Sequence, residues 1–145
     1  MRGLRGIILA AVMVAFSACL APQSAHMTGV DARSWRRAES ITYINNDTLS
    51  LRDMNIVLRH NSDLKQNTLP LKIAITTPDA RYFEEIREIK LQQSKTAFTV
   101  ATTNSIPYRT NVLLSQRGCY IISFEPLSEM RGVEAIGVEF SDNKD

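Results

Sequence analysis

The segment 71–76 reads Leu-Lys-Ile-Ala-Ile-Thr and is followed by the turn residues Thr77-Pro78-Asp79. Its large apolar side chains occupy every second position, which is the period of a β-strand with one buried face. The same period recurs in other short segments, which are separated by turn residues such as asparagine, aspartate and glycine. These further strand candidates are 41–45, 54–59, 98–100, 108–114, 120–124 and 133–140.

The segment 82–91, Tyr-Phe-Glu-Glu-Ile-Arg-Glu-Ile-Lys-Leu, is compatible with two structures. Its many charged residues would suit a helix. The alternative is a strand with a bulge, and we favour it because Ile89 and Leu91 alternate and strands are predicted on both sides. Seven or eight short strands with turns between them predict an all-β fold, a single antiparallel β-sandwich.

Residues 1–18 have the organisation of a signal peptide. Arg2 and Arg5 precede an uncharged apolar run at 7–16, which has the length of a signal-peptide core and is too short to span a bilayer. Phe16-Ser17-Ala18-Cys19 resembles a lipobox, in which small residues precede a cysteine that is acylated. We therefore predict a lipoprotein signal peptide, with Cys19 as the lipid-modified (palmitate-bearing) first residue of the mature chain. The alternative is an ordinary secretory signal in which Cys19 has no special role.

Charge gives no reason to expect a polyanionic partner. Of the 17 basic residues, Arg2 and Arg5 lie in the signal peptide, which contains none of the 15 acidic residues, so the mature chain carries 15 of each. A neutral chain gives no electrostatic case for binding nucleic acid or an anionic membrane surface. The acyl chains on Cys19 would supply the membrane attachment.

The mature chain divides into three predicted parts. Residues 19–34 lack periodicity and are predicted to be the acylated cysteine and a flexible tether. Residues 35–140 are predicted to form the sandwich domain, and 141–145 a polar, frayed tail. Cys119, the other cysteine, lies in an apparent strand and is predicted to be a buried small hydrophobe.

The chain shows no pattern typical of an enzyme. His60 follows a predicted strand and is interpreted as a solvated strand-end residue, because no further metal ligands accompany it. Glu84, Glu85 and Glu88 are interleaved with basic residues, which is typical of a solvated face. No nucleophile motif, zinc-protease motif or phosphate-binding glycine loop occurs. We predict no catalytic residue, no cofactor, no metal and no small-molecule substrate.

Two short motifs suggest binding or modification. Trp35-Arg36-Arg37 is a basic–aromatic cluster, in which Trp35 either contacts a partner or packs under the start of the domain. Asp47-Thr48-Leu49 resembles the Asp-Ser/Thr-aliphatic acceptor of a periplasmic O-glycosylation system, which makes Thr48 a candidate glycosylation site. An ordinary Asn-Asp turn explains the second motif equally well.

The succession of landmarks along residues 1–140 resembles the GldH family of gliding-motility lipoproteins. A lipobox and a short spacer lead to Trp35, and the chain closes on a glycine-bounded strand similar to the one that ends family members. The segments that carry the resemblance are 40–43, 55–61, 69–73, 77–79, 118–121, 130–131 and 132–140. Residues 92–107 lack the Gly-x-Trp-x-Gly pattern of the family, so the chain resembles a shortened, divergent member.

The resemblance implies a non-catalytic envelope lipoprotein that acts through contacts with motility or type IX secretion proteins. Arg131, next to the terminal strand, is then either a structural ion-pair residue or a partner contact. Leu20 and the absence of an acidic run in 20–24 predict attachment to the periplasmic face of the outer membrane. A carbohydrate-binding lipoprotein is the second hypothesis, since β-sandwiches often host sugar sites, and a small hydrolase is the third.

Overall fold

The computed structural model describes residues 25–92 and 101–143, and within these ranges it contains strands and no helix. The signal peptide, Cys19 and the strand candidate at 98–100 lie outside the described residues. The eight strands are β1 (Ala25–Gly29), β2 (Glu39–Asn45), β3 (Leu51–Asn61), β4 (Thr68–Thr76), β5 (Tyr82–Lys90), β6 (Ala101–Leu113), β7 (Gly118–Pro126) and β8 (Val133–Asp142).

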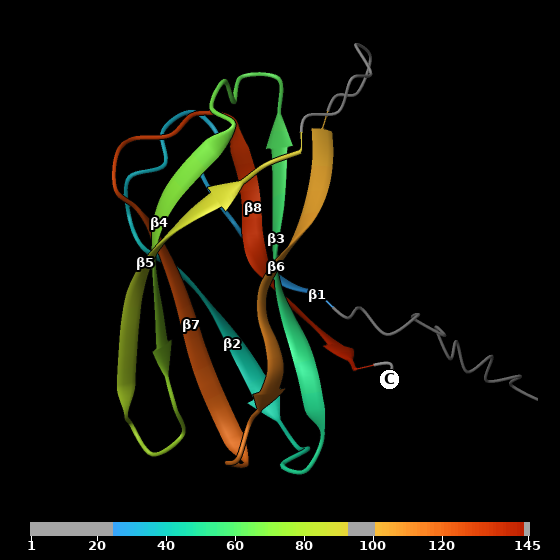
Figure 1. Cartoon of the computed structure of the whole chain (residues 1–145). Helices are drawn as coiled ribbons and strands as arrows, with labels where there is room; N and C mark the ends of the chain where they lie inside the picture. Colours follow the sequence, from blue (N-terminus) through green and yellow to red (C-terminus); the bar gives the residue numbers. More distant parts are fainter. Residues whose placement is uncertain (1–24, 93–100, 144–145) are drawn as a thin grey trace, which may run out of the picture.

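The strands form two four-stranded antiparallel sheets that pack face to face (Figure 1). The strand order is β1-β8-β3-β6 in the first sheet and β2-β7-β4-β5 in the second. Each sheet therefore combines strands that are distant in the sequence. The predicted all-β sandwich is confirmed.

The sandwich has two ends with different connections. We call the end with the connections 30–38, 62–67 and 127–132 the loop end, which is at the top of Figure 1. The opposite end carries the short connections 46–50, 77–81 and 114–117, and we call it the turn end. Connections alternate between the two ends because the paired strands are all antiparallel.

The positions of the core residues follow from the two-residue alternation of side chains along the strands. Ile73 and Ile75 on β4 are opposite Phe124 and Ile122 on β7, and these residues face the first sheet. The first sheet contributes Ile56, Leu58, Ile136 and Val138, all fully buried. The segment 82–91 also follows this rule, because β5 is a strand, as we favoured, and its Ile89 reaches the core. The bulge that we expected is absent, since β5 pairs with β4 in continuous register.

The folded domain is longer than the predicted 35–140. β1 lies inside the predicted tether and pairs with β8 from Ala25↔Glu139 to Gly29↔Ala135. This pairing requires Gly137, because a Cβ there would lie 1.8 Å from the carbonyl oxygen of His26. At the other terminus β8 includes Ser141 and Asp142, which pair with β3 instead of fraying.

Cys119 is exposed, so the prediction that it is buried is wrong. On β7 the inward positions belong to Tyr120, Ile122 and Phe124. Cys119 precedes them by an odd number of positions, and the pleat therefore directs it to the outer face. The apolar neighbours in the sequence were misleading, whereas the alternation already implied the outward side.

Candidate functional site

The two long sides of the sandwich differ in how closely their edge strands approach. On one side β1 and β2 lie together, and the rings of His26 and Tyr43 make an edge-on contact at 5.0 Å. On the other side the edge strands β5 and β6 enclose a cleft between the sheets. We call this the β5–β6 side, and Figure 1 shows these two strands, in yellow-green and orange, in front of the core.

The cleft on the β5–β6 side has a volume of about 390 Å³. Ile73 and Ile75 of β4 and Phe83 of β5 provide its apolar lining. Glu84, Glu85, Tyr108 and Arg109 provide the polar lining. An apolar lining with a few convergent polar groups is typical of a binding site.

Glu85 connects the two edge strands across this cleft. One of its carboxylate oxygens accepts hydrogen bonds from the Tyr108 hydroxyl and from Arg109, the latter at 2.5 Å. The other oxygen accepts a hydrogen bond from Nε of Arg87 at 3.2 Å. Both guanidinium groups also lie over the Tyr108 ring, 5.7 Å (Arg87) and 5.3 Å (Arg109) from its centroid. We call these four residues the Glu85 cluster.

The pKa values in this cluster move away from neutrality. The Tyr108 hydroxyl, followed by the Arg109 guanidinium, lowers the pKa of Glu85. Burial, followed by the bond to Glu85, raises the pKa of Tyr108 to about 12. A general acid or base works best with a pKa near the operating pH. Glu85 and Tyr108 are therefore suited to holding charge in a fixed place and poorly suited to proton transfer at neutral pH.

An apolar cavity of about 80 Å³ lies behind the cleft. Met54, Val112, Tyr120 and Phe140 contribute to its lining, together with Ile75 and Arg109, which line the cleft as well. Ile75 and Arg109 therefore lie where the cleft and the smaller cavity adjoin.

Exposed apolar side chains continue the cleft onto the molecular surface. Tyr82, Phe83 and Ile86 of β5 are 59%, 58% and 61% exposed, respectively. Phe83 is on the cleft-facing side of the strand, while Tyr82 and Ile86 are on the outer side. This apolar surface is larger than a single scattered residue, which makes the β5–β6 side a candidate interaction surface.

The backbone edge of β6 is poorly suited to strand addition. Pro107 lies within the strand and lacks an N–H group. Asn111 has a φ of 54° at an irregularity in the pairing with β3, where its backbone N–H donates to Asp53. Proline and bulges are common means of blunting sheet edges. A ligand or partner on this side would therefore be bound by side chains in the cleft and on β5.

The structure places the predicted partner contacts in opposite environments. Trp35 is 2% exposed, and its Nε1 donates a hydrogen bond of 2.7 Å to the carbonyl oxygen of Arg37. This burial corresponds to the alternative in which Trp35 packs under the start of the domain, and it leaves no ring surface for a partner. Arg131 is exposed, and its charge helps to lower the pKa of Glu129, after the bonds from Ser34 and Arg36.

The other candidate residues stand apart from the cleft. Thr48 is partly exposed in the turn between β2 and β3, where Asp47 accepts hydrogen bonds from the N–H groups of Leu49 and Ser50, each at 3.0 Å. His60 is the penultimate residue of β3 and lies 2.8 Å from the side-chain amide of Asn104. Among the described residues no group of three or more His, Cys, Asp and Glu side chains is placed to hold a metal ion.

The sequence predictions missed Tyr108 and Arg109. Their positions in a period-two segment suggested only a strand, and Glu85 appeared to be one charge on a solvated face. A signal was nevertheless present, because Arg87 and Glu85 occupy the same face of β5 as buried Ile89. Charged residues on the inward face of a strand indicate an edge or a site.

Comparison of the chain with models of known protein families, with curated proteins and with solved structures finds no match. A search of residues 25–92 and 101–143 finds no helix that is long and apolar enough to cross a membrane.

Proposed function

We propose that the protein is a non-catalytic lipoprotein that binds a protein partner through the β5–β6 side. In this proposal the lipid on Cys19 attaches it to the periplasmic face of the outer membrane. The observation that carries the binding role is the exposure of Tyr82, Phe83 and Ile86 beside an apolar cleft. The attachment rests on the lipobox-like segment 16–19.

The chemistry of the cleft supports binding. The Glu85 cluster holds fixed charges over an apolar floor, an arrangement that orients a bound group. Attachment to a membrane would raise the local concentration of the protein near partners in the same membrane, so a modest surface suffices for association. The GldH resemblance supports motility or type IX secretion proteins as the partner class.

Affinity capture from detergent-solubilised membranes tests this proposal when wild type is compared with Ile86→Asp. We expect the wild type to recover a defined set of envelope or secretion proteins, and Ile86→Asp to lose them. Burying a carboxylate in an apolar contact is unfavourable, so one substitution should suffice. Leu127→Asp is the matched control, because Leu127 is also about half exposed but lies at the loop end.

Two results would contradict the proposal. One is recovery of bulk outer-membrane proteins alone. The other is equal loss of the captured set in Ile86→Asp and Leu127→Asp, since the surface involved would then lie elsewhere.

A carbohydrate ligand is the second candidate, and one observation favours it. The cleft brings together two aromatic side chains, Phe83 and Tyr108, with the carboxylates of Glu84 and Glu85. Aromatic faces and carboxylates are common parts of sugar-binding sites. Binding to a glycan array that is lost in Phe83→Ala, and retained in Leu127→Ala, would favour this candidate over a protein partner.

A further inference from the structure

The turn end carries three exposed leucines. Leu49, in the turn between β2 and β3, is 89% exposed. Leu51 and Leu113 are 50% and 48% exposed, and they are opposite each other in the pairing of β3 with β6. Single exposed leucines are ordinary on protein surfaces, but three at one end form an apolar tip. We call these three residues the leucine tip.

The chain between Cys19 and the sheet is short. Five residues, 20–24, separate Cys19 from Ala25, where β1 begins. Six residue steps of fully extended chain span at most roughly 20–22 Å. Whatever path these residues take, a lipid on Cys19 holds Ala25 within that distance of the membrane surface.

The sheet register places the leucine tip within the same reach. Ala25 pairs with Glu139, and Glu139 pairs with Asn55 of β3. Leu51 is four positions from Asn55, which corresponds to about 13 Å along β3, and β3 lies two strands, or roughly 10 Å, across the sheet from β1. β1 runs from Ala25 towards the loop end, so Ala25 is the end of β1 nearer to the leucines.

We propose that the turn end rests on the bilayer and that the leucine tip inserts into its interfacial region. The proposal rests on the lipid attachment of the proposed function. For an anchored protein this second contact costs little additional entropy, because the lipid already confines the protein to the surface. In this orientation the loop end points away from the membrane, and the β5–β6 side remains open to a partner.

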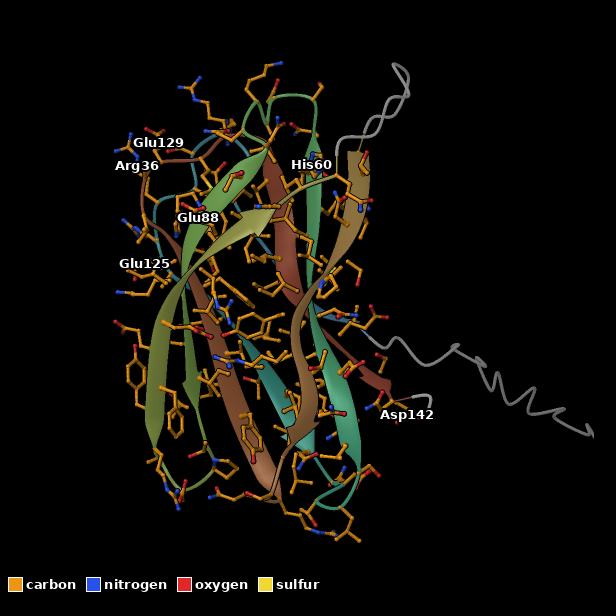
Figure 2. All side chains as sticks on the ribbon, viewed as in Figure 1. Arg36, His60, Glu88, Glu125, Glu129 and Asp142 are labelled. Carbon is orange, nitrogen blue, oxygen red and sulfur yellow. The ribbon has the colours of Figure 1, made fainter. Side chains whose placement is uncertain are left out.

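The charge at the turn end is compatible with an apolar contact. The turns at the turn end carry Asp47 and Asp79 against Arg81 and Arg117, which is a balanced set. The contact is therefore apolar, and it needs no anionic lipid and changes little with salt. The loop end is strongly charged, and Figure 2 shows Arg36 and Glu129 there, paired at 2.6 Å.

The test uses the acylated full chain reconstituted in vesicles of phosphatidylethanolamine and phosphatidylglycerol. Leu49→Cys is combined with Cys119→Ser and labelled with an environment-sensitive fluorophore. Leu127→Cys, in the same background, is the matched control at the loop end. We expect the label at 49 to emit at shorter wavelength in vesicles than in detergent-free buffer. We also expect lipid-borne nitroxides to quench it several-fold more strongly than the label at 127.

Three results would overturn the inference, and they separate it from the proposed function. If intact mass shows the lipid on Cys19 but the labels at 49 and 127 are quenched equally, the tip does not touch the bilayer and the attachment stands. If the mass shows no lipid and the protein leaves the membrane, both proposals fail. If the mass shows a hexose on Thr48, a sugar next to Leu49 keeps the tip from the lipid.

Discussion

The loop end of the sandwich is closed by apolar side chains, whereas the turn end is closed by a polar network. At the loop end Trp35 and Met130 are almost fully buried and exchange backbone hydrogen bonds of 2.8 and 3.0 Å. At the turn end Arg52 is buried and donates to the Tyr43 hydroxyl at 2.6 Å and to Asn45 Oδ1 at 2.8 Å. Asn45, which has no exposed surface, donates to the carbonyl oxygens of Leu114 and Gln116.

The two kinds of closure stabilise the fold in different ways. Apolar packing at the loop end stabilises the fold through the area that it buries, and it tolerates changes in the orientation of the side chains. The network at the turn end consists of hydrogen bonds, which depend on the direction of donor and acceptor. It therefore fixes β2, β3 and the turn 114–117 in one arrangement. Both hydrogen-bonded partners of Arg52 are neutral, and the rings of Tyr43 and Phe140 lie 5.7 and 5.3 Å from its guanidinium carbon. The network therefore holds the chain beside two of the leucines, because Arg52 adjoins Leu51 and residue 114 adjoins Leu113.

The largest expected effect is at the loop end. Trp35→Ala removes the biggest buried side chain there and should lower the free energy of unfolding by about 3–5 kcal/mol. Trp35→Phe keeps most of the apolar volume and should lose less. Chemical denaturation measures both. A loss below about 1 kcal/mol for Trp35→Ala would show that this end does not depend on apolar closure.

A smaller loss is expected at the turn end. Asn45→Ala leaves one guanidinium nitrogen of Arg52 and the carbonyl oxygens of residues 114 and 116 without this partner. We expect a decrease of about 1–3 kcal/mol in the free energy of unfolding. Asn46→Ala, the exposed neighbour, should change it by no more than about 0.5 kcal/mol. Equal effects of the two substitutions would mean that the network adds no stability.

The smallest expected effect concerns pH, and it compares one carboxylate with a lowered pKa at each end. At the turn end the Ser50 hydroxyl, then the N–H groups of Leu49 and Ser50, lower the pKa of Asp47 from 3.8 to about 2. At the loop end the Ser34 hydroxyl, then Arg36, lower the pKa of Glu129. A carboxylate with a lowered pKa stabilises the fold above its unfolded pKa. That contribution is lost as the pH falls through the folded value.

Among the carboxylates whose pKa is lowered, Glu129 and Asp47 should therefore lose their contributions to stability in different pH ranges. The Glu129 part is lost as the pH falls below 4.5, and the Asp47 part between 3.8 and about 2. Ser34→Ala should raise the pKa of Glu129 and leave that of Asp47 unchanged, as followed by carboxyl resonances in an NMR titration. A shift of both groups would mean that the two ends are electrostatically coupled.

Much of the fold was predictable because the alternation of side chains is a local property. The pattern in 71–76 and 120–124 requires only that one face of each strand be buried, and the structure buries it. The same rule favoured a strand at 82–91, and the structure confirms it. β1 was not predicted, because it has little buried side-chain surface and is defined by its backbone pairing with β8.

The candidate site was not predictable in the same way. Glu85 and Tyr108 are 23 positions apart, and their contact depends on β5 and β6 becoming the neighbouring edges of different sheets. Arg52 lies before the predicted strand at 54–59, yet β3 includes it and its inward position buries it. In both cases the chemistry of the residue comes from neighbours that only the strand order supplies.

The amino-acid sequence determined the strands that bury one face, and which face that is, because a two-residue period is set by adjacent side chains. It also carries the lipobox-like segment on which the proposed membrane attachment rests. The tertiary structure alone decided that the sheet starts at Ala25, that Trp35 is buried, and that a cleft lies between β5 and β6. The reason is that sheet order joins residues far apart in the chain, and no local pattern specifies those partners.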